Sequence, residues 1–257
     1  MTTEPATEAV LSLDDLRKIL AICSPTGLLV GGQALAFWSN FFNVERPSTL
    51  AVTITADADF IGDSELARKL ARKLRWTLWV PSLDDATSQT GKVTHSLKDG
   101  RVKQVDFLSG VIGLGTRELA RRAVEIELPD VGRLRVIHPL DVLDSRIQNL
   151  HLLEEKRTTN GIAQGQLAVA VARAFMHSEI GEKGERTALK SLERVAEISS
   201  DVAALKVFLR YGIDALEAIP IERFKTTGAL HEKRWPQICE LVARKRNALR
   251  RVSAPKP

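Results

Sequence analysis

Hydrophobic and polar positions change their spacing once along this chain, near residue 139. Before that point, short apolar runs alternate with amphipathic stretches, which predicts strands interleaved with helices. Beyond Pro139 the apolar residues recur every three or four positions, and no segment alternates as a strand does. The pattern predicts an α+β fold: a mixed sheet with flanking helices in a head over residues 10–138, then an all-helical C-terminal domain over residues 139–257.

The head is expected to contain three helices and several strands. Ser12 and Asp63 can cap two of the helices, and a third begins at Gln33. Lys98-Asp99-Gly100 is typical of a hairpin turn. The predicted strands lie at residues 27–30, 50–60, 76–80, 92–97, 101–108, 124–128 and 133–137. The predicted helices of the second domain lie at residues 139–155, 161–178, 184–199, 201–217 and 230–250.

One predicted strand carries two carboxylates on the same face. Apolar and polar residues alternate from Leu50 to Phe60, so Asp57 and Asp59 project together. Carboxylates held this close repel each other unless a cation lies between them. Asp106 lies in another, largely apolar strand, where a charge without a partner would be costly. Because Mg²⁺ prefers carboxylate oxygens, the sequence predicts a metal site made of these three aspartates.

Gly31-Gly32 lies between an apolar strand and the start of a helix. In that position free N–H groups and the positive end of the helix can face an anion such as a phosphate. The pair is also compatible with an ordinary tight turn. Its place ahead of the carboxylates favours the phosphate interpretation.

Composition narrows the class of protein only slightly. The 257 residues are 44% hydrophobic and 27% charged, as in ordinary globular proteins, and the net charge of +5 weakly favours an anionic partner. No apolar run approaches the roughly 18 residues that span a membrane, and no secretory signal is visible. Two distant cysteines fit a reducing cytoplasm, and the five histidines lack the spacing of zinc ligands.

These motifs together carry a resemblance. The chain resembles the DNA polymerase beta-like nucleotidyltransferase superfamily in three successive motifs: Leu-Leu-Val-Gly31-Gly32, Thr-Ala-Asp57-Ala-Asp59-Phe and Val-Asp106-Phe-Leu. Within it, the pattern is most similar to AbiEii-type abortive-infection toxins and related bacterial nucleotidyltransferase-like proteins. The matching motifs lie within residues 28–157.

The resemblance implies a function for each matching residue. Gly31 and Gly32 would contact a nucleoside triphosphate, Asp57 and Asp59 would bind Mg²⁺ or Mn²⁺, and Asp106 would be a metal ligand and the base for an attacking hydroxyl. It implies transfer of a nucleoside monophosphate to tRNA or a protein side chain. It also implies a toxin of a toxin–antitoxin or phage-defence system, with an antitoxin as partner.

The chain departs from the family pattern at several positions. Gly32 stands where many members have serine, so no hydroxyl is available there. Ser145-Arg146 occupies a place where relatives often carry lysine, and an acidic pair expected after Arg157 is replaced by a segment ending in Gln164. These departures concern the acceptor more than the metal site.

Two other interpretations use some of the same residues. Haloacid dehalogenase-like phosphatases also use Asp-x-Asp, but Asp84-Asp85, the only later acidic pair near a strand, lies in a polar loop. The stronger alternative is a catalytically inactive module that senses a nucleotide or binds a partner. The basic C-terminal helix at residues 230–250 could then follow a phosphate backbone, although it also fits a solvated amphipathic helix.

Overall fold

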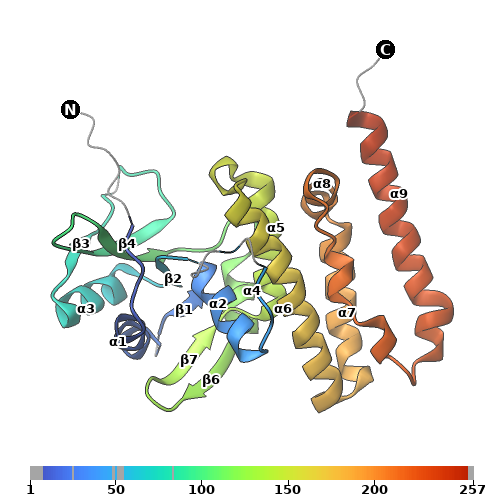
Figure 1. Ribbon diagram of the computed structural model, residues 1–257, viewed down its shortest axis with the longest axis horizontal. Helices are drawn as coiled ribbons and strands as arrows, with labels where there is room; N and C mark the ends of the chain where they lie inside the picture. Colours follow the sequence, from blue (N-terminus) through green and yellow to red (C-terminus); the bar gives the residue numbers. More distant parts are fainter. Residues whose placement is uncertain (1–7, 25, 48–49, 51–54, 83, 254–257) are drawn as a thin grey trace. The chain divides into compact units, whose positions relative to one another are not determined.

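The computed structural model describes the chain except for residues 1–7, 25, 48–49, 51–54, 83 and 254–257. Two compact units are present. One comprises Met1–Phe37 with Ala51–His138, and the other comprises Trp38–Leu50 with Pro139–Pro257. The first unit contains the strands and the second is helical, so the α+β prediction is confirmed (Figure 1).

A seven-stranded mixed sheet organises the first unit, with the order β3-β4-β5-β2-β1-β7-β6. The central strand β2 pairs parallel with β5 and antiparallel with β1, and β1 pairs parallel with β7. β4 and β5 form the hairpin expected around Lys98-Asp99-Gly100, and β6 and β7 form a second antiparallel pair. The strands are β1 (Leu28–Val30), β2 (Ala58–Ile61), β3 (Thr77–Trp79), β4 (Gln89–Ser96), β5 (Val102–Leu108), β6 (Val124–Leu128) and β7 (Gly132–Val136).

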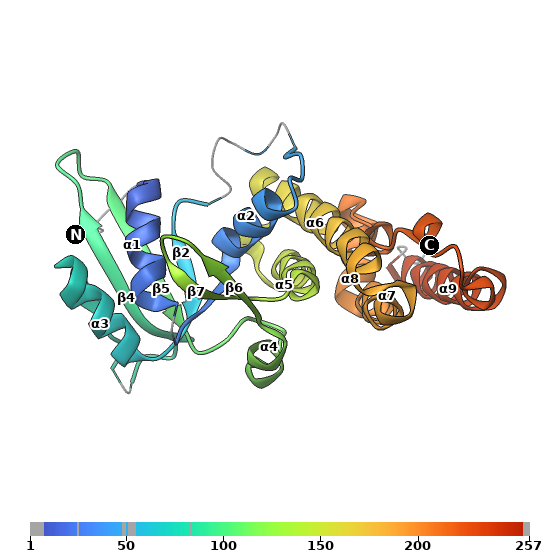
Figure 2. The ribbon, with the colours of Figure 1, turned by 90° about the horizontal axis from the view of Figure 1, so that it is seen from below.

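Helices α1 (Leu13–Cys23) and α3 (Ser64–Leu74) lie next to each other against the sheet (Figures 1 and 2). Both begin at the caps that the sequence predicts. Ser12 forms a capping box with Asp15, and Asp63 accepts a hydrogen bond from the Leu66 N–H. The core between helices and sheet is apolar and includes the stacked rings of Phe60 and Phe107.

The second unit is a layered set of helices. It contains α5 (Pro139–Leu152), α6 (Thr159–Lys183), α7 (Glu185–Ser200), α8 (Val202–Tyr211) and α9 (Trp235–Ser253), together with short helical turns. Asp141 on α5 is fully buried, where a charge needs a partner, and it accepts a hydrogen bond from Arg194 on α7. Phe42 contacts Trp38 and Phe175, which packs the Trp38–Leu50 segment against α6.

The structure corrects three details of the predicted elements. The expected strand over residues 50–60 begins only at Ala58. Ala56 and Asp57 form a bend, at which the Ala56 carbonyl accepts a hydrogen bond from the Leu11 N–H and the Thr55 hydroxyl donates to Asp57. Residues 51–54 of that prediction lie outside the described part. The helix expected over residues 201–217 ends at Tyr211, where Gly212 adopts a left-handed conformation. Helix α4 (Thr116–Arg122) was not predicted.

Within the described residues, every helix is too short or too polar to cross a lipid bilayer.

Glu185, at the start of α7, holds the chain segment that precedes α9. Its carboxylate accepts hydrogen bonds from the hydroxyls of Thr227 and Thr226 and from the N–H groups of Thr226 and Lys225. The Thr227 hydroxyl is the largest of the influences that lower the pKa of Glu185 to about 2. In the unfolded chain the same carboxyl group has a pKa near 4.5. The ionised form of Glu185 therefore stabilises the folded state.

We therefore predict that this contribution is complete above about pH 4.5 and is lost as the pH falls through about 2. Glu185→Gln should lower the free energy of unfolding at pH 7 and flatten its decline between these values. Urea titrations at several pH values measure both effects. Glu197→Gln, at an exposed position of the same helix, is the control. Equal pH dependence in Glu185→Gln and the parent chain would contradict the prediction.

Candidate metal and nucleotide site

The candidate site is built on the register between two neighbouring parallel strands. β2 and β5 align Asp59 with Asp106 and Phe60 with Phe107. Since side chains alternate between faces along a strand, the two phenylalanines enter the core together and the two aspartates project together from the opposite face. Burial of the aromatic pair therefore determines which face the carboxylates take.

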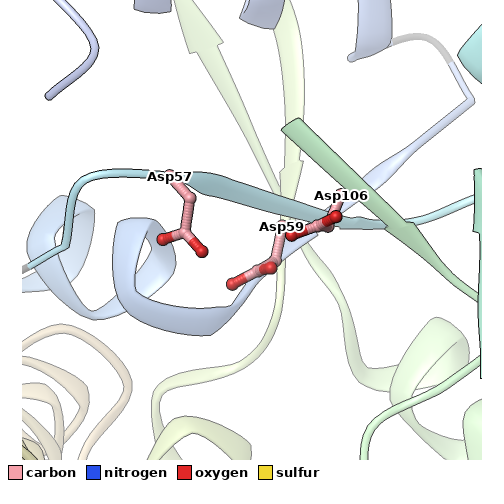
Figure 3. A group of neighbouring side chains, drawn as sticks. All are labelled: Asp57, Asp59 and Asp106. Carbon is pink, nitrogen blue, oxygen red and sulfur yellow. The ribbon is translucent and has the colours of Figure 1, made fainter. Parts of the chain in front are cut away.

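The third carboxylate comes from the residue that leads into β2. Asp57 lies one position before the strand, and its side chain returns to the same region as Asp59 and Asp106 (Figure 3). One oxygen from each of the three carboxylates lies within 4.8 Å of the others. The structure thus brings together all three predicted metal ligands. Asp57 reaches the cluster from a bend and not from the predicted strand.

Asp106 is the most buried member of the cluster, with 6% of its surface exposed. Its two oxygens accept hydrogen bonds from two side-chain amides, Gln89 at 3.0 Å and Gln104 at 2.6 Å. The Lys92 ammonium lies 3.8 Å away, on the residue of β4 that pairs with Asp106. These groups offset the desolvation of a buried carboxylate and hold it in one orientation.

The cluster carries more negative than positive charge. Two unit charges 4 Å apart interact by about 4 kcal/mol at the effective dielectric of a protein surface, so three neighbouring carboxylates oppose one another. The Lys92 ammonium, 3.8 Å from Asp106, is one ion-pair partner of the cluster. A divalent cation would relieve this repulsion.

Gly31 passes directly over Asp59. It opens α2 (Gly31–Phe41) with φ of +66°, a conformation that favours glycine, and a Cβ atom there would overlap the Asp59 carboxylate. A Cβ on Gly32 would lie 2.5 Å from that of Thr55, the residue that holds Asp57. Only glycine fits at these two positions, because the N-terminus of α2 lies so close to the segment that carries Asp57 and Asp59. That end of the helix carries a partial positive charge.

The donor set fits a hard divalent cation. Three carboxylates supply only oxygen ligands, as Mg²⁺ and Mn²⁺ prefer. Oxygens on one octahedral Mg²⁺ are about 3 Å apart when adjacent, so a spread of up to 4.8 Å requires small side-chain rotations or a pair of ions about 3.5–4 Å apart.

The other residues considered from the sequence take no part in this cluster. His95 stacks on Trp76, with ring centroids 5.3 Å apart, and Asp85 closes a turn by accepting from Ser82. Arg146 donates to Gln164 within the helical unit.

Sequence reasoning missed the polar residues that support the aspartates. The contact of Gln104 could have been predicted, because Gln104 lies two positions before Asp106 on the same face of the strand. The contact of Gln89 could not, since it depends on a register irregularity between Gln89 and Gly91 in the β4–β5 pair. Thr55 lies two positions before Asp57, and its hydrogen bond to Asp57 was not foreseen.

Comparisons with known proteins give remote structural similarity only. No family model matches the chain, and no curated protein matches it significantly. Three similar solved structures each have 14% sequence identity. An antigenic nucleotidyltransferase-like protein from Paracoccidioides brasiliensis has a TM-score of 0.35, with 71% of this chain and 95% of that chain covered. The Megavirus polyadenylate synthase has a TM-score of 0.38, with 70% and 38% covered. JHP933 from Helicobacter pylori has a TM-score of 0.38, with 91% and 94% covered.

Replacing Gly31 should damage the site through its contact with Asp59. Gly31→Ala introduces both a strained backbone, which costs about 1–3 kcal/mol, and an overlap with the carboxylate. Gly100→Ala is a matched control, because Gly100 also has positive φ but has nothing within 4 Å of the added atom. Urea denaturation should give a larger loss of stability for Gly31→Ala. Equal losses would show that only backbone strain matters.

Divalent cations should stabilise the folded chain through the aspartates. At a hundredfold excess over Kd, Mg²⁺ or Mn²⁺ should raise the free energy of unfolding by about 2.7 kcal/mol, and Asp59→Asn should abolish the increase. The same variant should be at least as stable as the parent without metal, because one repelling charge is removed. Thermal melts with and without EDTA measure this, with the exposed Asp84→Asn as control. Equal metal-induced shifts in both variants would contradict the assignment.

Proposed function

We propose that this protein is a metal-dependent nucleotidyltransferase that moves a nucleoside monophosphate from a nucleoside triphosphate to a hydroxyl. The observation that carries the proposal is the Asp57, Asp59 and Asp106 cluster, whose oxygens lie within 4.8 Å of one another. Three convergent carboxylates are a donor set for Mg²⁺ or Mn²⁺, and Gly31 brings a helix N-terminus directly against them.

Each residue then has a distinct role. Asp57 and Asp59 hold the divalent ion. When bound, the ion would neutralise part of the negative charge of the triphosphate. Gly31 and Gly32 let the N-terminus of α2 approach Asp59 and Thr55 closely, and the N–H groups of that helix end would bind a phosphate of the nucleotide. Gln89 and Gln104 orient Asp106, whose carboxylate retains further lone pairs that can accept a proton.

The proposed reaction balances as a single displacement at phosphorus. The acceptor oxygen forms a bond to the α-phosphorus while the bond from that phosphorus to the bridging oxygen breaks. Pyrophosphate leaves, and the hydroxyl proton passes to Asp106, which acts as the general base. The product is the acceptor carrying a phosphodiester-linked nucleoside monophosphate.

The acceptor and biological setting rest on the resemblance to abortive-infection toxins. It favours tRNA or a protein side chain as acceptor, a cytoplasmic location, and an antitoxin that restrains the activity. The net charge of +5 is compatible with an RNA acceptor.

A nucleotide-sensing or partner-binding module is the second candidate. The observation that favours it is the environment of Asp106, whose burial is already supported by two amides and the Lys92 ammonium and does not depend on a divalent ion. Such a chain would bind a nucleotide through the same residues but transfer nothing.

Label transfer distinguishes the two candidates. The full-length chain is incubated with Mg²⁺ or Mn²⁺, each nucleoside triphosphate labelled at the α-phosphorus, and separate pools of tRNA and protein. We expect label to enter one pool, and Asp57→Ala or Asp59→Ala to lower the rate at least about a hundredfold by removing charge stabilisation. Asp84→Ala should retain the activity.

Binding measurements decide the case in which no label is transferred. Nucleotide and metal that raise the melting temperature without any transfer would support the sensor. If neither raises it, both candidates fail.

A further inference from the structure

A cavity of about 670 Å³ lies within the helical unit and shares no residue with the aspartate cluster. Its walls come from the end of α5, from α8, from the last turns of α9, and from Arg157. Pockets that take small molecules measure about 300–1,000 Å³, so this cavity is large enough for a nucleotide-sized ligand. Its lining residues are Leu150, His151, Arg157, Lys206, Val207, Leu209, Arg210, Tyr211, Leu249 and Arg250.

The charged lining of the cavity is of one sign. Arg157, Lys206, Arg210 and Arg250 contribute four cations and no carboxylate lines the walls. None of the four forms an ion pair with a carboxylate in the part of the chain that the structure describes. Burial and then the nearby Lys206 and Arg157 lower the pKa of His151, while the capping residue Asp201 opposes them. The cavity is therefore a region of positive potential.

Tyr211 contributes an aromatic ring to the wall of the cavity. Its hydroxyl is shielded from solvent, so the ring and not the hydroxyl is available to a ligand. The Arg210 guanidinium lies over the Tyr211 ring, 5.4 Å from its centre. An aromatic ring and a guanidinium plane offer surfaces on which a nucleobase can stack.

The remaining walls are apolar. Leu150, Val207, Leu209 and Leu249 would contact an uncharged, planar part of a ligand rather than a bare inorganic anion. A ligand with both a phosphate and a base satisfies the cations and the apolar and aromatic walls together.

We propose that this cavity is a second nucleotide-recognition site, in which Lys206 and Arg210 hold a phosphate of a nucleoside phosphate and Tyr211 and the leucines receive its sugar or base. The site needs no metal and does not depend on catalysis by the aspartates. The nucleoside phosphate belongs either to a free nucleotide or to a single-stranded RNA, which present the same chemistry.

Binding in EDTA tests the proposal on the full-length chain. Adenosine monophosphate is titrated by calorimetry, and a fluorescein-labelled single-stranded RNA of ten nucleotides is titrated by anisotropy. We expect at least one probe to bind, more weakly as salt rises, with unchanged affinity in Asp59→Asn. Tighter binding of the mononucleotide assigns the site to a free nucleotide, and tighter binding of the RNA assigns it to a strand.

Matched charge reversals locate the site. Lys206→Glu/Arg210→Glu should weaken binding at least about tenfold, whereas Arg186→Glu/Lys190→Glu, at exposed positions of α7, should change it less than about twofold. Both variants alter the net charge equally. Equal weakening by the two, or no binding of either probe, would overturn the proposal, as would loss of binding in Asp59→Asn.

Arg210→Gln removes one charge and keeps a long polar side chain, so it remains informative if the charge reversals prevent folding. We expect it to weaken binding about threefold to tenfold, through loss of one cation beside the phosphate. An affinity equal to that of the parent chain would overturn the proposal.

Discussion

The in-register pairing of β2 with β5 is the constraint on which the aspartate site depends. It places Phe60 beside Phe107 in the core and Asp59 beside Asp106 on the opposite face. A shift by one residue on either strand would bury a carboxylate and expose a ring, at a cost of several kcal/mol. The same hydrophobic packing that stabilises the sheet therefore keeps two like charges together.

Repulsion between these charges is managed locally, by three kinds of contact. The Thr55 hydroxyl binds Asp57, two amides bind Asp106, and Gly31 allows a helix N-terminus to approach Asp59. Each contact comes from a different part of the chain. The site is thus a product of the whole sheet region and not of the Asp-x-Asp motif alone.

Alternation and spacing were enough to predict most elements and the three aspartates. The faces of β2 and β5 follow from Asp59-Phe60 and Asp106-Phe107, because side chains alternate along any strand. The bend at Asp57 could not be predicted, since the neighbouring Ala56 carbonyl pairs with the N–H of Leu11, a residue distant in the sequence. Gln89 depends on an irregular strand register, and the basic cavity depends on the packing of three helices separated in sequence.

The amides of Gln89 and Gln104 have one more consequence. They fix the direction of the Asp106 carboxylate without cancelling its charge, as an arginine in the same place would do. The Asp106 carboxylate is therefore already held in one direction, and an ion that bound there would cost little side-chain freedom. The folded chain would present this oxygen to such an ion as a preformed ligand, and not as a side chain that the ion must first order.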